Sequence, residues 1–176
     1  MKAKSSSWQD MIKPVVVLFT ICAVVSALLS YVNSITDPII AENTRIEAEK
    51  TRREVLPGAQ SFTEIDCDMA ALDITGAYKE TSGLGYVMTS SHKGYDGQVV
   101  VTIGLDNEGR IVGISADVST ETQGVGSKAG QSAYLDKYMG LSGDASGVDT
   151  ITGATYSSSA VKAGVNAILA AFEKVK

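Results

Sequence analysis

The sequence comprises 176 residues, of which 44% are hydrophobic and 20% are charged. This composition excludes an intrinsically disordered chain and a protein with many membrane spans, and the length allows one domain of ordinary size with an appendage. The formal net charge of −5 argues against a nucleic-acid partner. The charge is unevenly distributed, because residues 1–36 carry a net charge of +2 and the remainder carries −7.

A transmembrane helix is predicted for residues 14–36. This stretch contains no charged residue and is almost wholly apolar up to residue 32, which is about the length that a helix needs to cross a bilayer core of roughly 30 Å. Lysines precede the stretch and Asp37 follows it, so the positive-inside rule predicts a cytoplasmic tail, residues 1–13, and an extracytoplasmic C-terminal part. A cleaved signal peptide usually has a shorter apolar region of about 7–15 residues. We therefore expect an uncleaved, single-pass anchor in the cell (inner) membrane.

Residues 37–58 are predicted to form a charged helical stalk. Asp37 before Pro38 is typical of a helix N-cap followed by proline at the first helical position, and a Pro-Gly pair ends the charged run. The apolar face of residues 42–54 is weak, which favours a solvated stalk or a helix that faces a partner. Residues 59–77 are expected to be irregular, with short strands or a helical turn around Ile65, Met69, Leu72 and Ile74.

Residues 78–118 are predicted to form a β-sheet. A short strand is expected at residues 85–88, and a clear hairpin follows it. Residues 98–105 form its first strand, residues 106–109 a tight turn that ends in glycine, and residues 110–118 the returning strand. The alternation predicts that one face of the first strand is formed by Val99, Val101, Ile103 and Leu105.

Cysteine and histidine residues provide no catalytic or metal-binding cluster in the sequence. Cys22 lies in the apolar stretch and Cys67 in the predicted outer domain, so no disulfide between them is expected. His92 is the only histidine, and its polar neighbours predict an exposed loop residue. A Ser-His-Asp hydrolase is not supported, because the sequence lacks a G-x-S-x-G motif.

The segment Thr152-Gly153-Ala154-Thr155-Tyr156-Ser157-Ser158 precedes a strongly periodic helix. The apolar face of that helix is predicted to consist of Val161, Val165, Ile168, Leu169 and Phe172. Free N–H groups and the helix dipole favour an anion at a helix N-terminus, typically a phosphate. A simpler interpretation is that Thr155 or Ser157 only caps the helix.

Three motifs of this sequence resemble those of the FMN-binding domain family. Residues 152–158 resemble its S/T-G-A-T-x-S/T-S signature, residues 94–97 (GYDG) its G-Y-x-G segment, and residues 121–126 (ETQGVG) its E-T-P-G-L-G loop. Gln123 departs from the family proline, which puts the shape of that loop in doubt, and Val125 replaces leucine. The family includes the G subunit of Rnf complexes and the C subunit of the sodium-pumping NADH:quinone oxidoreductase.

The resemblance implies an α+β fold, in which a single N-terminal transmembrane helix precedes an extracytoplasmic FMN-binding domain, residues 59–176, with an antiparallel sheet and flanking helices. One of these helices is expected at residues 132–139, with Ala133, Leu135, Tyr138 and Met139 available to the core. By the same resemblance, Thr155 carries FMN through a phosphoester bond. The further flavin-binding residues that it implies are Tyr95, Glu121, Thr122, Gly124, Val125, Gly126, Lys128, Thr152, Gly153, Ala154, Ser157 and Ser158.

The function implied by the resemblance is electron transfer in an Rnf-type complex, which couples ferredoxin:NAD⁺ electron transfer to Na⁺ or H⁺ translocation. The expected partners are other Rnf membrane subunits, including a second flavin subunit and iron–sulfur subunits, and a flavin transferase for maturation. No catalytic residue and no metal site of its own are expected, because the sequence lacks a nicotinamide-binding fingerprint and cluster-ligating cysteines. The alternatives are the C subunit of the quinone reductase and a membrane-anchored binding or sensory module without flavin.

Overall fold

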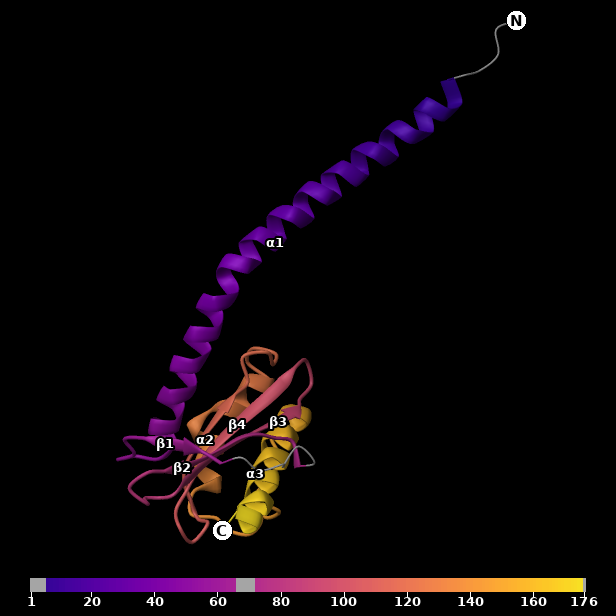
Figure 1. Ribbon diagram of the computed structural model, residues 1–176. Helices are drawn as coiled ribbons and strands as arrows, with labels where there is room; N and C mark the ends of the chain where they lie inside the picture. Colours follow the sequence, from indigo (N-terminus) through magenta and orange to yellow (C-terminus); the bar gives the residue numbers. More distant parts are fainter. Residues whose placement is uncertain (1–5, 66–71, 176) are drawn as a thin grey trace, which may run out of the picture. The chain divides into compact units, whose positions relative to one another are not determined.

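The computed structural model describes residues 6–65 and 72–175, with side chains from residue 12 onward. The chain divides into two units, Met1–Glu47 and Ala48–Lys176. Cys67 and Met69, which figured in the predictions above, lie outside the described residues. The second unit contains the sheet and the remaining helices (Figure 1).

Helix α1 runs without interruption over Ser6–Val55 and contains both Pro14 and Pro38. The predicted helix start at Asp37 is therefore wrong. The Asp37 carboxylate accepts a hydrogen bond from Asn33 Nδ2 at 2.8 Å, one turn earlier in the same helix, instead of capping a new helix. An internal proline removes one backbone hydrogen bond, whereas two new helix ends would leave about eight backbone groups without helical partners.

The N-terminal part of α1 is long and apolar enough to cross a membrane by length and composition. Its apolar side chains are exposed, among them Val15, Phe19 and Leu29. A run of exposed apolar side chains of this length is unfavourable in water but stable in the hydrocarbon of a bilayer. We therefore identify this part of α1 as a single membrane span.

The second unit is built on a five-stranded antiparallel sheet with the strand order β1-β2-β3-β4-β5. The strands are β1 Phe62–Glu64, β2 Ile74–Glu80, β3 Tyr86–Lys93, β4 Gln98–Leu105 and β5 Ile111–Asp117. The predicted hairpin is confirmed, since β4 pairs antiparallel with β5, with an irregularity between Gly104 and Leu105, and Gly109 has φ 81° in the turn. Strand β1 and the beginning of β2 lie in residues 59–77, which were expected to be irregular with short strands or a helical turn. Strand β3 extends beyond the short strand predicted at residues 85–88.

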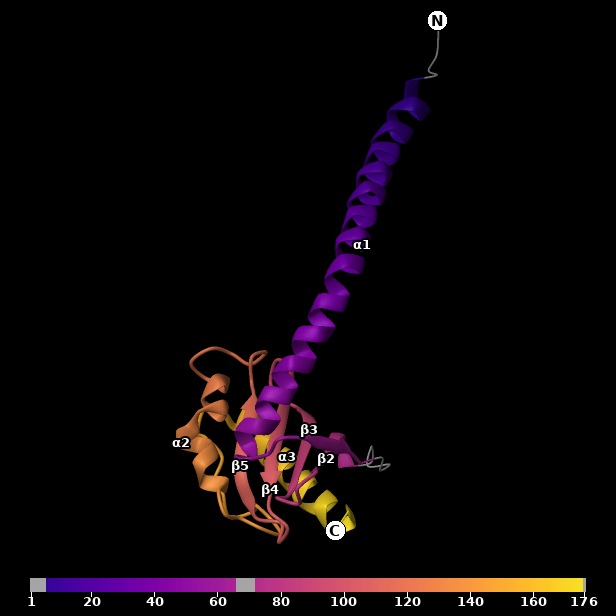
Figure 2. The ribbon, with the colours of Figure 1, turned by 60° about the vertical axis from the view of Figure 1, so that its left-hand side comes forward.

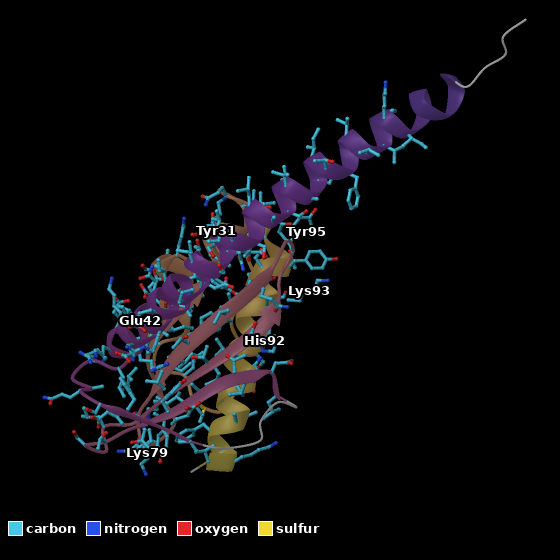
Figure 3. All side chains as sticks on the ribbon, turned by 45° about the horizontal axis from the view of Figure 1, so that its top comes forward. Tyr31, Glu42, Lys79, His92, Lys93 and Tyr95 are labelled. Atoms are coloured by element: carbon cyan, nitrogen blue, oxygen red, sulfur yellow. The ribbon has the colours of Figure 1, made fainter. Side chains whose placement is uncertain are left out.

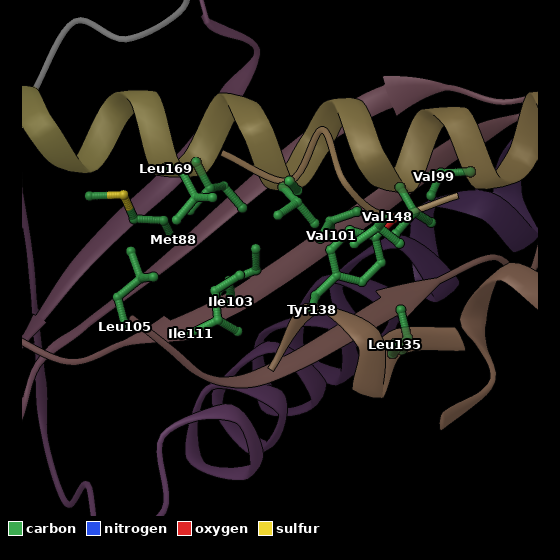
Figure 4. Close-up of a cluster of buried hydrophobic side chains, with 14 of the residues drawn as sticks. Met88, Val99, Val101, Ile103, Leu105, Ile111, Leu135, Tyr138, Val148 and Leu169 are labelled. Atoms are coloured by element: carbon green, nitrogen blue, oxygen red, sulfur yellow. The ribbon is translucent and has the colours of Figure 1, made fainter. Parts of the chain in front are cut away.

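Helix α3, Thr155–Val175, packs on one face of the sheet across β3 and β4 (Figures 1 and 4). Both predicted apolar faces are confirmed: Val99, Val101, Ile103 and Leu105 are fully buried, and so is the helix face that contains Val161 and Phe172. Burial of each such side chain favours folding by about 1.5–3 kcal/mol. This core fixes the start of α3 relative to the end of β3 and the beginning of β4.

The opposite face of the sheet receives the C-terminal end of α1, which belongs to the second unit. Val55 and Leu56 are buried together with Val87 of β3. A Cβ atom on Gly104 or Gly113 would lie 2.1 or 2.2 Å from the Val55 carbonyl oxygen, so this close approach requires glycine at both positions. The last turn of the predicted stalk is therefore part of the folded domain rather than solvated.

Residues 132–139 form two short helical pieces beside β5 (Figure 2), α2 Ser132–Leu135 and η3 Asp136–Tyr138. Leu135 and Tyr138 are buried as predicted, but Ala133 and Met139 are exposed, and Tyr134 takes the place expected for them in the core. The Tyr134 and Tyr138 hydroxyls lie 2.8 Å apart. Burial and the hydrogen bond with Tyr134 raise the pKa of Tyr138, so the Tyr138 hydroxyl stays protonated at physiological pH.

The prediction for His92 is wrong, because it lies on β3 and is half-buried rather than exposed in a loop. Nδ1 lies 3.8 Å from the Asp73 carboxylate, and Nε2 is buried. The polar neighbours in sequence were misleading because alternate residues of a strand face opposite sides of the sheet.

Candidate functional site

Three segments that are distant in sequence enclose one pocket of about 360 Å³. They are the β3–β4 connection, residues 94–97, the loop after β5, residues 121–126, and the start of α3. The pocket is lined by Tyr95, Glu121, Thr122, Val125, Gly126, Gly153, Ala154, Thr155, Tyr156 and Ser157. The three sequence motifs thus meet at one site.

The chain that leads into α3 is held by side chains of α3 itself. Lys162 Nζ donates to the backbone carbonyl oxygens of Ser146 and Val148 at 2.7 and 2.8 Å. Asn166 Oδ1 accepts the N–H of Ala145 at 2.8 Å. These contacts satisfy backbone groups of a loop that forms no ladder with the sheet, and they fix the direction from which the chain enters the helix.

Ser158 stabilises the turn that leads into α3. Its hydroxyl accepts the N–H of Ile151 at 3.0 Å and donates to the Ala154 carbonyl at 2.8 Å, across a turn in which Gly153 has φ 84°. The alternative that Thr155 or Ser157 caps the helix is thus not what the structure shows. Among the described residues, the backbone N–H groups of Thr155, Tyr156 and Ser157 have no hydrogen-bond acceptor.

The Thr155 side chain is exposed and belongs to the pocket lining. Within the part of the chain that the structure describes, its hydroxyl makes no hydrogen bond. It lies beside the three unpaired N–H groups at the positive end of a helix of 21 residues, where a negatively charged group is stabilised. An unengaged hydroxyl next to an anion site is the arrangement that a phosphoester on this residue requires.

Glu121 of the 121–126 loop connects this loop to the other two segments that line the pocket. It is buried, with only 3% of its surface exposed. Its Oε1 atom accepts the backbone N–H groups of Tyr95, Asp96 and Gly97 at 3.1, 3.2 and 3.3 Å. Its Oε2 atom accepts a hydrogen bond from the Ser157 hydroxyl. We call Glu121 and these four donors the Glu121 cluster.

The Glu121 cluster keeps its carboxylate ionised. Desolvation of the buried group is the largest single influence and raises the pKa, but the hydrogen bonds from Ser157 and from the three backbone N–H groups together outweigh it. The pKa of Glu121 therefore lies below its usual value of 4.5. The negative charge is compensated inside the protein by donors, so the side chain is not available to a neighbouring subunit.

Two glycines make room for the Glu121 cluster. A Cβ atom on Gly94 would lie 2.4 Å from Glu121 Oε1, and one on Gly126 would lie 2.7 Å from Ser157 Oγ. Real Cβ contacts do not reach such distances, so these glycines are required for close approach rather than for turning the chain. This explains physically why glycines appear in both the GYDG and the ETQGVG segments.

Two tyrosines and a valine form an apolar rim around the pocket. The exposed fractions of Tyr95 and Tyr156 are 69% and 71%, and their ring centroids lie 6.1 Å apart at an interplanar angle of 51°. The ring of Tyr95 projects away from the ribbon beyond the end of β3 (Figure 3). Val125 is also exposed. Large exposed apolar side chains around a pocket indicate a surface that a planar apolar group or a partner covers.

The structure brings together nine of the predicted site residues as pocket lining and leaves four outside it: Gly124, Lys128, Thr152 and Ser158. Ser158 is fully buried in the turn described above, and Lys128 is exposed within η2, Gly126–Gly130. Sequence reasoning missed Tyr156. Its place at the variable position of the signature concealed it, although an aromatic residue directly after Thr155 could have indicated a stacking surface.

The pocket fits a flavin mononucleotide by size and by chemistry. Ligand pockets usually measure about 300–1,000 Å³, and this one lies in the lower part of that range. The unpaired N–H groups at the start of α3 suit a phosphate, and the tyrosine rings suit a planar aromatic ring system. Within residues 6–65 and 72–175, no group of His, Cys, Asp and Glu could hold a metal ion.

Comparison with known proteins first defines the class. Residues 94–170 match the family of FMN-binding domains, so the domain that carries the three motifs is an FMN-binding domain.

Whole-chain relatives then define the family. The chain is 30% identical to the G subunit of the Na⁺-translocating ferredoxin:NAD⁺ oxidoreductase complex of Acetobacterium woodii, over 96% of this chain and 94% of the relative. It is 24% identical to the G subunit of the proton-translocating ferredoxin:NAD⁺ oxidoreductase complex of Clostridium ljungdahlii, over 82% of each chain. It is 28% identical to the G subunit of the ion-translocating oxidoreductase complex of Stutzerimonas stutzeri, over 69% of this chain and 58% of the relative. The chain belongs to this family of G subunits.

Proposed function

We propose that this chain is a membrane-anchored electron-transfer subunit of an Rnf-type ion-translocating oxidoreductase complex and carries FMN in a phosphoester bond to Thr155. The observation that carries the proposal is the position of the Thr155 hydroxyl, which is unengaged, lines the pocket and lies beside the unpaired N–H groups of α3. The relation to G subunits over nearly the whole chain favours this complex over the sodium-pumping quinone reductase.

The chain's own groups provide for the phosphate. The N–H groups of Thr155, Tyr156 and Ser157 point along the axis of α3 at its positive end, where they can bind the charged phosphate oxygens. The hydroxyls of Ser157 and Ser158 already bind Glu121 and the Ala154 carbonyl, so backbone N–H groups are the main donors.

Attachment of FMN forms one bond and breaks one bond. The Thr155 oxygen bonds to the phosphorus, the bond between the phosphorus and the leaving group breaks, and the hydroxyl proton leaves. A flavin dinucleotide is a suitable donor, since its other half departs as a nucleoside monophosphate. We propose that a separate flavin transferase catalyses this step, because the described part of the pocket contains no histidine or other evident general base apart from the fully engaged Glu121.

The bound flavin would supply reversible electron uptake and release, and the protein would hold and tune it. Tyr95 and Tyr156 would contact its ring system, and Gly153 and Gly126 allow the backbone to approach it. A covalent tether keeps the cofactor at the site even where no free FMN is available to rebind. This matters for a domain on the outer side of a membrane.

The proposed domain arrangement rests on the distribution of charge. Residues 1–13 would lie in the cytoplasm, residues 14–36 would cross the membrane, and residues 37–58 would connect to an extracytoplasmic domain of residues 59–176. Electrons would pass to and from other membrane subunits of the complex, including a second flavin subunit and iron–sulfur subunits.

The decisive experiment measures the intact mass of the full-length protein made in cells that contain a flavin transferase. We expect a mass increase equal to FMN minus water, located on Thr155 by peptide mapping and absent from Thr155→Ala. Thr152→Ala is the matched control, because this exposed threonine of the same motif lies outside the pocket and should keep the flavin. An unmodified wild-type protein would overturn the proposal and favour a binding module without flavin.

A further inference from the structure

We infer that Glu121 is a positioning residue for flavin attachment. Its carboxylate joins the 94–97 segment to the start of α3, and it thereby fixes the position of the Thr155 hydroxyl in the pocket. This inference rests on the proposed attachment of FMN to Thr155. It assigns to Glu121 a role through other residues rather than contact with an electron partner.

Glu121 connects segments that are remote from it in the sequence. The donors to its carboxylate lie 24 to 26 positions earlier in the sequence and, in the case of a serine, 36 positions later. Within the 94–97 segment itself, the one backbone hydrogen bond is Gly94 N–H to the Gly97 carbonyl at 2.8 Å. Glu121 therefore provides most of the hydrogen bonds that hold this segment at the pocket.

Ser157 links Glu121 to Thr155. It lies in the first turn of α3, two positions after Thr155, and its hydroxyl is bound to Glu121 Oε2. In a helix, fixing one residue of the first turn fixes the backbone of its neighbours. On the other wall, the N–H groups of Tyr95, Asp96 and Gly97 are bound to Oε1, and the Tyr95 ring faces the Tyr156 ring. The Glu121 carboxylate therefore holds both sides of the pocket, the 94–97 segment and the first turn of α3, in place.

The negative charge of Glu121 also matters to the cluster. A carboxylate only accepts hydrogen bonds, and each of its oxygens here faces donors. Glutamine has nearly the same shape but replaces one oxygen by an NH₂ group, and its remaining oxygen is a weaker acceptor. Glu121→Gln should therefore loosen the cluster without creating a cavity. The attachment rate, which depends on how the hydroxyl is placed, should be more sensitive than the fold.

The test uses the full-length protein in membranes, with a flavin transferase and a flavin dinucleotide, and follows the rate of FMN attachment by mass spectrometry. We expect Glu121→Gln and Ser157→Ala each to slow attachment about tenfold or more. If Glu121 acts through Ser157, the double variant should be no slower than the slower single variant.

Glu80→Gln is the matched control. Glu80 is 1% exposed, and its Oε2 atom also accepts two backbone N–H groups, from Ser82 and Leu84. However, it lies outside the pocket lining. This variant should lower the melting temperature, though less than Glu121→Gln does, but attach FMN at the wild-type rate.

Hydrogen exchange supplies a second readout that does not depend on the flavin. Glu121→Gln should speed exchange at the N–H groups of residues 95–97, whereas Ser157→Ala should leave them protected. Wild-type attachment rates in Glu121→Gln, or an equal slowing in Glu80→Gln, would overturn the inference. A wild-type protein that takes up no FMN would instead overturn the proposed function.

Discussion

Two buried glutamates build two different regions of this domain. Glu80, at the end of β2, binds N–H groups two and four residues further along the chain and closes the turn before β3. Glu121 binds groups that lie 24 to 36 residues away. The first carboxylate completes a local turn, while the second holds together three segments around a pocket.

The comparison shows that burial and hydrogen bonding of a carboxylate do not by themselves indicate a functional site. In both cases desolvation raises the pKa and hydrogen bonds outweigh it, so the pKa of each glutamate is lowered. Glu121 differs from Glu80 in two ways. Its hydrogen-bond donors lie far from it in the sequence, and they surround a pocket with exposed aromatic rings and an unengaged threonine hydroxyl. The following predictions test this distinction.

The largest effect is expected from glycine substitutions, which separate crowding from backbone strain. Gly126→Ala places a Cβ atom 2.7 Å from Ser157 Oγ and 2.9 Å from the Glu121 side chain. We expect it to lower the unfolding free energy by about 3 kcal/mol, because a buried cluster must shift, and to slow FMN attachment. In Gly83→Ala, in the Glu80 turn, the added Cβ atom would meet no neighbour, but the residue has φ +82°. Backbone strain should lower the unfolding free energy by about 1 kcal/mol, and FMN attachment should not change. Urea unfolding followed by near-ultraviolet circular dichroism measures both values.

An intermediate effect is expected in acid. Because the folded-state pKa of both glutamates lies below the usual value of 4.5, the unfolded chain takes up the proton first as pH falls. Their stabilising contribution is therefore present above pH 4.5 and is lost as pH falls through the folded-state pKa.

In Glu121→Gln and in Glu80→Gln, the unfolding free energy should fall less steeply with decreasing pH than in the wild-type protein. The slope should decrease more in Glu121→Gln, since both Glu121 oxygens have donors whereas the buried Glu80 Oε1 has no hydrogen-bond partner among the described residues. Equal slopes in the two variants would contradict the comparison.

The smallest effect is expected at the surface of the Glu80 turn. Asn107 Nδ2 donates to the Gly83 carbonyl at 2.8 Å and is exposed. Asn107→Ala should lower the unfolding free energy by about 0.5 kcal/mol, because water replaces an exposed hydrogen bond at little cost. FMN attachment should not change. A clear loss of attachment in this variant would mean that the two regions are coupled.

Much of the fold could be predicted from local pattern. The alternation of residues 98–105 and the periodicity of α3 predicted both faces of the core, because burial acts on every second residue of a strand and on one stripe of a helix. The expected helix break at Pro38 failed for a different reason. Local capping chemistry was outweighed by the backbone hydrogen bonds that a continuous helix retains.

The candidate site was predicted in part. The three motifs indicated where the chain would approach a ligand, and nine of the thirteen predicted site residues line the pocket. Tyr156 was missed because it stands at the variable position of the signature. The burial of Val55 was missed because nothing in the neighbouring sequence reveals which remote surface that side chain will contact.

The sequence by itself determined the apolar span, the hairpin, the buried face of α3 and the identity of the three motifs, because each depends on residues close together in the chain. Only the tertiary structure decided what Glu121 does. Its four donors come from segments that the sheet and α3 bring together, and its ionisation depends on that convergence. Contacts between remote segments arise from packing of the whole core, which no local pattern contains.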